Sequence, residues 1–459
     1  MGFGGINVAL SALYAQRQAL ETTGHNIANA NTEGYTRQRV SLAANAGPIT
    51  PAMFETYSGA GAGVRVDSIE RLNDHFLQLR SLQEHAADSG LQQTKTILTR
   101  AELAFAEPGD NGIQAQLADF WSAWDDVANT PDDLATRTQL LEKAQTVTAG
   151  FRQASSDLKS LQVSSVSQVA DDVAQINSMA QSIAQLNAGI DTAVNGGLNS
   201  ADLEDQRDKL IQQLNQLTGV TIRDGRNKTV DVFINGNAIV RGRDATAVHL
   251  DTTGSTAVLK WDLDNSGVNI TTGKVSALLN AANNTLPGYL AKLDTIAQTF
   301  MTTVNTQHAA GVDLNSSPSA TPSGQNLLNG TGAADIDVDA TVTPDKVAAA
   351  AVNGGRLDGS NALVLAEMGS MPTGADAAYR SFIDSLGVDV MRAGTQSDIQ
   401  AEITRQADTA SQSASGVNLD EEMANMVAFQ HAYDAAARFM TAIDQQLDTL
   451  IHNTGLVGR

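Results

Sequence analysis

The residue types that most often carry catalysis or hold metals are scattered along this chain. Its seven histidines stand at spacings that suit no common set of zinc ligands, at positions 25, 75, 85, 249, 308, 431 and 452. Cysteine is absent, which excludes thiol catalysis, disulfides and thiolate metal sites. No G-x-S-x-G motif occurs, and no Ser, His and Asp set stands out. The sequence therefore predicts a protein that is not an enzyme, with no cofactor and no metal site.

Two stretches imitate ligand-binding loops. Residues 262–267, Asp-Leu-Asp-Asn-Ser-Gly, copy the first half of a calcium loop, but the twelfth position is Gly273, where a bidentate glutamate is needed. The glycine-rich SGAGAGVRV that begins at Ser58 could cradle a phosphate, but no strand-helix unit with a ribose-binding acid surrounds it. We interpret the first stretch as a solvated turn and the second as permissive backbone beside a packed arm.

The overall charge excludes two classes of partner. The 459 residues include 29 lysines and arginines against 51 aspartates and glutamates, a formal net charge of −22. Binding to phosphate backbones needs clustered cations, so we expect no nucleic-acid partner, and anionic lipids would repel the chain, so we expect no membrane partner. No apolar run approaches the roughly 20 residues of a membrane-spanning helix. The opening MGFGGINVALSALYAQRQAL also lacks the features of a signal peptide.

The two ends of the chain carry matching hydrophobic ladders. Their residues recur at alternating spacings of three and four, the pattern of a coiled-coil seam. Arg17 and Gly24 interrupt the first ladder, and Ala436 weakens the second. We predict that the apolar members form an assembly seam, consisting of Ile6, Leu10, Leu13, Leu20, Ile27, Met426, Phe429, Tyr433, Met440, Ile443, Leu447 and Leu450.

Two interpretations of these ladders are open. The terminal helices could dock on a globular core, or they could stay loosely ordered in the monomer and complete their seams only against neighbouring copies. A pair of helices this short is close to the limit of stability in water, which favours the second interpretation. In both, the two ends are built to lie against each other, and everything between them is an insertion.

Helical periodicity dominates the middle of the chain, with one interruption. It predicts a long helix from near Ser68 to residue 106, a helix around two core tryptophans, and a rod-like helical hairpin over 136–217. Near residue 220 the apolar period changes to two, with turns at Asp224-Gly225 and Asn235-Gly236 that are typical of β-hairpins. The helical period returns from Val275.

These patterns predict a mainly α protein with a small β domain. It would have paired N- and C-terminal coiled-coil helices, an elongated helical-bundle domain and an inserted antiparallel β domain. The terminal helices and an extended arm would occupy 1–50 and 415–459, the bundle 51–217 and 274–414, and the β domain 218–273. A loop-rich cover at 312–375 would belong to the bundle.

Three stretches resemble flagellar axial proteins. They are TTGHNIANANTEGYTRQR at 22–39, SGAGAGVRVDSIERLNDHFLQLR at 58–80 and SGVNLDEEMANMVAFQHAYDAAARFMTAIDQQLDTLI at 415–451. The GYTRQ sequence after the Asn-rich turn and the long helical middle separate the chain from the hook protein, and flagellin lacks that turn. The chain is similar to the family of the first flagellar hook-associated protein, FlgK. Many members carry an additional outer domain, which we expect to be missing here.

The resemblance implies a structural protein that forms the junction between the flagellar hook and filament by self-assembly through its terminal helices. The implied partners are copies of itself in a ring, the hook protein, the second hook-filament junction protein and a flagellar export chaperone on the C-terminal helix. The implied location is extracellular, in the bacterial flagellum, after export without a cleaved signal peptide. The alternatives are another axial protein, of the hook or distal rod, and a secreted adhesin or enzyme on an axial scaffold.

Overall fold

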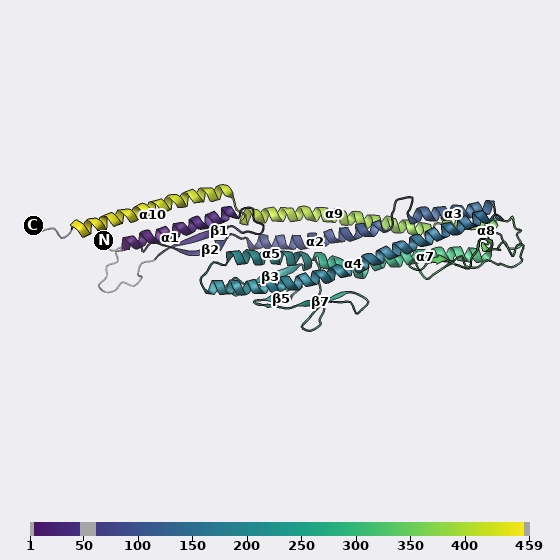
Figure 1. Cartoon of the computed structure of the whole chain (residues 1–459), viewed down its shortest axis with the longest axis horizontal. Coiled ribbons are helices and arrows are strands. Elements are labelled where there is room, and N and C mark those ends of the chain that lie inside the picture. The colour runs from purple at the N-terminus through teal and green to yellow at the C-terminus, as the bar shows by residue number, and fades with distance from the viewer. Residues whose placement is uncertain (1–3, 46–60, 454–459) are drawn as a thin grey trace, which may run out of the picture.

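The chain forms a long, narrow bundle of helices (Figure 1). The computed structural model describes residues 4–45 and 61–453, so the end of the predicted arm segment 1–50 and the start of the glycine-rich stretch lie outside the described residues. The two terminal helices, α1 (Gly4–Ala28) and α10 (Leu419–Asn453), run side by side at one end of the molecule. The predicted mainly α class with paired terminal helices is confirmed.

Long amphipathic helices build the body of the rod. The longest, α4 (Leu134–Asn195), carries a stripe of buried residues at spacings of three and four, which includes Val169, Ile176, Ile183 and Ile190. This stripe faces its neighbours in the bundle and makes α4 the spine of the rod. The other long helices of the bundle, with the short α6, are α2 (His75–Leu103), α3 (Ile113–Asn129), α5 (Ala201–Thr218), α6 (Gly273–Asn280), α7 (Leu286–Ala310) and α9 (Ala375–Ser415).

Aromatic rings fill the core between α3, α4 and α7. Trp124 is fully buried, and Phe120 packs edge-on against both Trp124 and Phe300. Trp121 is also buried, and its indole N–H donates to Asp376 at 2.9 Å. Edge-to-face contacts of this kind stabilise a core beyond the area they bury. The two tryptophans are core residues, as the sequence indicated.

An extended arm connects α1 to the rod. Strands β1 (Gln38–Ala44) and β2 (Val64–Arg71) pair antiparallel, with a register shift between Ser41 and Leu42. The helix expected from near Ser68 was placed wrongly, because the strand continues to Arg71 and α2 begins only at His75. Asp74 sets this start, since its carboxylate accepts the backbone N–H groups of Phe76 and Leu77.

Short strands between α5 and α6 lie against the spine. Strands β3 (Val220–Asp224), β4 (Val230–Ile234), β5 (Asn237–Arg241) and β6 (Asp244–Ala245) form one antiparallel sheet, and β7 (Val248–Asp251) pairs with β8 (Val258–Trp261). The amide of Asn187 in α4 donates to the carbonyls of Val230 and Gly242, and that of Asn177 donates to Val248. The apolar side chains of these strands belong to the same core cluster as those of the helices.

The end of the rod far from the termini is closed by loops and short elements. They are β9 (Leu328–Asn329), β10 (Asp337–Val338) and α8 (Ser360–Glu367). Buried Arg137 of α4 ties these loops down, because its guanidinium donates to the carbonyls of Pro131, Pro344 and Val347. Burial lowers the pKa of this guanidinium, and its donors are satisfied by these backbone carbonyls.

Candidate assembly surface

The terminal helices form an antiparallel pair with a defined register. A Cβ atom placed on Gly5 would lie 3.1 Å from Cδ1 of Ile443, so the start of α1 meets the last third of α10. At the other end, the amide of Asn26 donates to Glu422 at 3.0 Å, so the end of α1 meets the first turn of α10. The two contacts fix the pair over nearly the whole length of α1.

The structure places the predicted seam residues along this pair without burying any of them fully. Leu10, Tyr433 and Leu450 are exposed, with 41%, 37% and 47% of their surface accessible. The others are half-buried, namely Ile6, Leu13, Leu20, Ile27, Met426, Phe429, Met440, Ile443 and Leu447. One chain therefore covers only part of the apolar surface that the two ladders present.

Small residues form the deepest contacts of α1, and the predicted ladder missed them. Ala9, Ala15 and Ala19 are each 1% exposed, and Thr22, Thr23 and Asn26 continue the buried set toward the end of the helix. Small side chains allow helices and strands to approach closely, and α1 packs against both α10 and the arm. Their recurrence at helical spacing was the available signal, but a search for large apolar residues passes over it.

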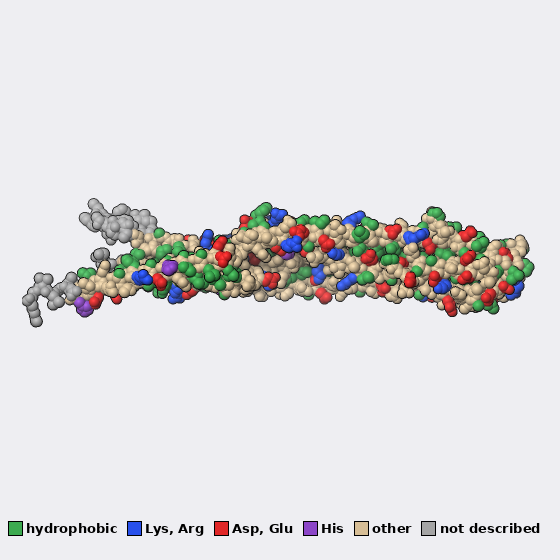
Figure 2. Space-filling view, turned by 90° about the horizontal axis from the view of Figure 1, so that it is seen from above, with side chains coloured by type: hydrophobic (Ala, Val, Ile, Leu, Met, Phe, Trp, Pro, Cys, Tyr) green, Lys and Arg blue, Asp and Glu red, His purple; other side chains and the backbone are tan. Residues whose placement is uncertain are grey.

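A second apolar stripe lies on the outside of α10. Leu419, Met423 and Val427 are 46%, 61% and 51% exposed and follow one another at intervals of four, so they share a face. Phe439 is also exposed, as is Tyr14 of α1. Figure 2 shows hydrophobic side chains gathered over the terminal part of the molecule. Exposed apolar surface of this extent is typical of a protein interface.

A buried amide joins α1, the arm and α10 at the base of the pair. The side chain of Asn26, 1% exposed, donates to Gln38 O at 2.8 Å and accepts from Gln38 N at 2.9 Å. It also accepts from the Tyr35 hydroxyl at 2.7 Å and donates to buried Glu422. All four hydrogen-bonding positions of the amide are used, which fixes its orientation.

Arg37 links the arm to the start of α10. Its guanidinium lies 2.7 Å from Glu421 and 2.7 Å from Glu422, and its backbone N–H donates to Ser415 O at 3.0 Å. Ser415 ends α9, so a single residue of the arm contacts both sides of the link between α9 and α10. We call Asn26, Arg37, Gln38 and Glu422 the polar joint.

A buried cluster of charges fastens the arm to α5. The Arg71 guanidinium forms ion pairs with Glu204, Asp205 and Asp208 at 3.3, 2.7 and 2.8 Å. Burial raises the pKa of the Asp205 carboxyl despite Arg71 beside it. Burial also opposes ionisation of Glu204, but hydrogen bonds from Ser200 and Lys228 hold its pKa below the ordinary value. Removing Arg71 would leave buried carboxylates uncompensated, which is strongly destabilising.

The two ligand-like stretches take the forms interpreted from the sequence where the structure describes them. Asp264 accepts from the N–H and hydroxyl of Ser266, which closes the exposed turn 262–267. Gly63, with φ of +97°, packs against Ser11 and Val8 of α1. Among residues 4–45 and 61–453, no three or more histidines or carboxylates cluster as metal ligands would. Nor does any helix within those residues have the length and apolarity to cross a membrane.

Three family models match the chain over most of these elements. The model described as the FlgK helical domain of flagellar hook-associated protein matches residues 98–321. A flagellar basal body rod protein model matches residues 6–36, and the C-terminal model of the basal body rod FlgEFG proteins matches 410–453. The terminal matches therefore fall on α1 and α10, and the helical-domain match falls on the rod.

Curated relatives match from end to end. The chain is 29% identical to flagellar hook-associated protein 1 of Bacillus subtilis, over 100% of the chain and 99% of the relative. It is 26% identical to the proteins of the same name from Escherichia coli and Salmonella typhimurium, over 97% of the chain and 99% of each relative. These alignments run over 517, 555 and 562 positions, so the relatives carry segments that this chain lacks.

A solved structure has the same fold. The flagellar hook junction protein FlgK from Burkholderia pseudomallei superposes with a TM-score of 0.63 at 16% identity. The match covers 73% of this chain and 100% of that chain.

Proposed function

Because the chain belongs to the family of flagellar hook-associated protein 1, FlgK, we propose that it forms the junction between the hook and the filament by assembling through its terminal helices. The observation that carries the proposal is the half-covered seam of α1 and α10. Nine of its twelve residues are only half-buried and the other three are exposed, so the chain presents a long apolar surface that a neighbouring copy can complete.

The position of the apolar surfaces at one end of the molecule supports a role in a tube of repeated subunits. The seam and the outer stripe of α10 lie at one end of the molecule, and the polar joint connects this end to a rod with its own core. A subunit of this kind adds to a ring through its ends while its body keeps its fold. Such an assembly buries the same apolar residues in every copy.

The partners follow from this position. They are copies of the same chain in a ring, the hook protein on one side, the second hook-filament junction protein on the other, and an export chaperone that covers α10 before assembly. Exposed Met423 and Val427 support the chaperone contact, because an apolar helix face needs cover before it reaches its final site. The role is structural rather than enzymatic, and the location is extracellular, in the bacterial flagellum.

The lack of cysteine gives a direct test of position. Ser255→Cys would place a single thiol on the exposed turn between β7 and β8, and maleimide-coated gold would label it on isolated flagella. We expect gold particles at the boundary between hook and filament, and none on flagella of the unsubstituted chain. Label along the hook, or at its base, would indicate a hook or rod protein instead.

A further inference from the structure

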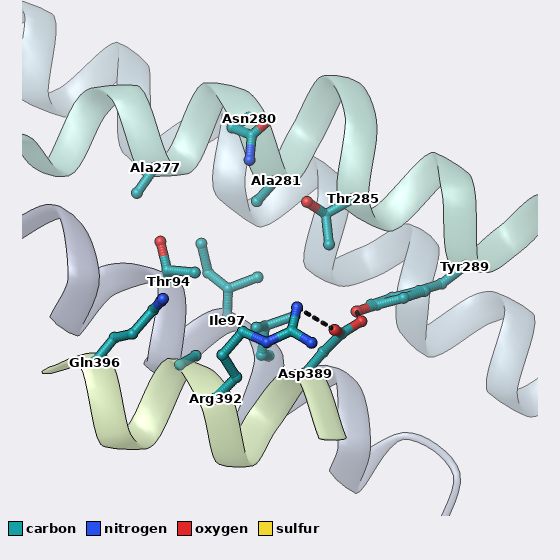
Figure 3. Close-up of a pocket in the computed structure, with 12 residues that line it drawn as sticks. Thr94, Ile97, Ala277, Asn280, Ala281, Thr285, Tyr289, Asp389, Arg392 and Gln396 are labelled. Carbon is teal, nitrogen blue, oxygen red and sulfur yellow. Dashed lines mark hydrogen bonds and ion pairs between the residues drawn. The ribbon is translucent and has the colours of Figure 1, made fainter. Parts of the chain in front are cut away.

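A cavity of about 230 Å³ opens between α2, α9 and the π-helical turn that joins α6 to α7 (Figure 3). This turn, Ala281–Thr285, is wound more widely than the α-helices on either side of it. Buried Ile97, Leu98 and Ala281 belong to the lining. The space is far larger than the roughly 15 Å³ that holds one water molecule, so it has room for a side chain.

The rim of this cavity carries a cation that is weakly held. Arg392 of α9 extends across the opening toward Asp389, and the two lie 3.6 Å apart. The side chain of Arg392 is 64% exposed, and Asp389 also accepts from the Tyr289 hydroxyl. An exposed pair at this distance contributes little to stability, so the guanidinium is available to a second carboxylate.

A leucine of the same chain projects from the opposite side of the rod. Leu263 is 85% exposed in the turn 262–267 that follows β8. This turn is held tightly, since Asp264 bonds to Ser266 and the backbone of Trp261 bonds to Asn265 and Ser266. The projection therefore combines a fixed apolar side chain with a carboxylate next to it.

The two features lie at a similar level along the rod. Figure 1 shows the β7–β8 region beside the middle of the rod, on the side away from α9, whose middle lines the cavity. Copies related by rotation about a common axis present opposite sides to each other, and such head-to-tail contacts generate rings. A turn on one side and a cavity on the other therefore suit neighbours in one ring.

We propose that Leu263 of one copy enters this cavity of the adjacent copy, where Arg392 pairs with Asp264 beside it. The occupant is a second copy of this chain, and the contact links the rods of neighbours at a level separate from the terminal seam. The proposal rests on the proposed function, because it requires a ring of copies.

Disulfide trapping tests the contact, because the chain has no cysteine of its own. Leu263→Cys would be combined with Ala277→Cys, which lines the cavity, and junctions isolated from swimming cells would be oxidised. We expect a ladder of linked dimers and larger multiples. The matched control is Leu263→Cys with Leu357→Cys, an exposed residue far from the cavity, which should give no ladder. Swimming cells whose junctions yield no ladder with the first pair would overturn the contact but leave the proposed function standing.

A second variant decides the question if the paired cysteines prevent assembly. Leu263→Ser changes only an exposed side chain, so the chain should fold, reach the hook and carry filaments that shear off several-fold more readily. Val258→Ser, 40% exposed on neighbouring β8, is the control that should match the unsubstituted chain. Equal shear resistance of both variants would refute the proposal. Absence of either protein from the hook-filament boundary would instead refute the proposed function.

Discussion

Met440 stands in the middle of the α10 seam, half-buried and one turn before Ile443, whose side chain reaches Gly5. A residue in this position is partly covered in one chain and would become fully covered between copies. On the proposed function, its side chain should therefore contribute modestly to the isolated fold and strongly to assembly. Gln445, by contrast, lies on the exposed face of the same helix and off the seam.

Met440→Asp should separate folding from assembly. A carboxylate enclosed between copies, with no cation assured beside it, costs several kcal/mol per subunit, on the order of the burial penalty of an unpaired charge. We expect an exported protein with unchanged helix content by circular dichroism, found in the medium of cells whose hooks lack filaments. Gln445→Asp should support swimming. Motility retained by Met440→Asp would show that this face is not an assembly seam.

Asn26 holds the base of the terminal pair through four hydrogen bonds, so its amide nitrogen matters as much as its oxygen. Asn26→Asp replaces the donor by an oxygen that faces Glu422, at a cost of about 2–5 kcal/mol. We expect tryptic cleavage after Arg37 to accelerate at least about tenfold, since 1.4 kcal/mol corresponds to a factor of about ten. Asn31→Asp, at an exposed position in the turn that follows α1, should leave the rate unchanged. Equal cleavage rates of the two variants and the unsubstituted chain would mean that the ends are loosely ordered in the monomer.

At the scale of elements, the sequence revealed those features that depend on local periodicity. The ladder of α4 was predictable because side chains at regular spacing share a face of the helix. The Asn235-Gly236 turn was predictable because tight hairpin turns need positive φ, which Gly236 adopts at +88°. The start of α2 was not, since the apolar residues of β2 also fit the beginning of a helix.

The polar joint was beyond reach for a different reason. Arg37 and Glu422 of the joint are 385 positions apart, and Arg71 and Glu204 of the charge cluster on α5 are 133 apart, so only the fold brings each pair together. The cavity beside the π-helical turn could not be predicted either, because the sequence of Ala281–Thr285 carries no local signal for wider winding. Of the candidate site, the sequence therefore predicted the apolar ladders but neither the small-residue face of α1 nor the charges that anchor the arm.

Buried His308 in α7 should make the free energy of unfolding depend on pH. Its ring is fully buried, hydrogen-bonds to the Gln325 carbonyl through Nδ1, and accepts from Ala348 N–H through Nε2, which requires the neutral form. Burial lowers its pKa from 6.5 to about 4. The unfolded chain therefore takes up the proton first as the pH falls.

The free energy of unfolding should consequently lose a contribution of roughly 3 kcal/mol between pH 6.5 and pH 4, because each pKa unit is worth about 1.4 kcal/mol. Above pH 6.5 this contribution should be constant. Urea unfolding of His308→Gln should give a lower stability at pH 7 but a flatter dependence on pH, whereas His431→Gln, at an exposed site of α10, should keep the full slope. Identical slopes for His308→Gln and the unsubstituted chain would contradict this account.

The molecule as a whole is a rod with different surfaces at its two ends. One end carries the terminal pair and its uncovered apolar residues, and the other is closed by loops pinned to α4. The polar joint and the Arg71 cluster connect the pair to the rod through the arm, so the direction of the pair is set by buried charge contacts. A net charge of −22 keeps such a surface from associating at random before it reaches its site.

Electron microscopy of flagella from cells that lack the gene for this chain would show whether it joins the filament to the hook. We expect complete hooks without filaments, with unpolymerised filament protein in the medium, and restoration of filaments when the chain is supplied again. Filaments attached to hooks in the deletion strain, or cells without hooks, would contradict this expectation.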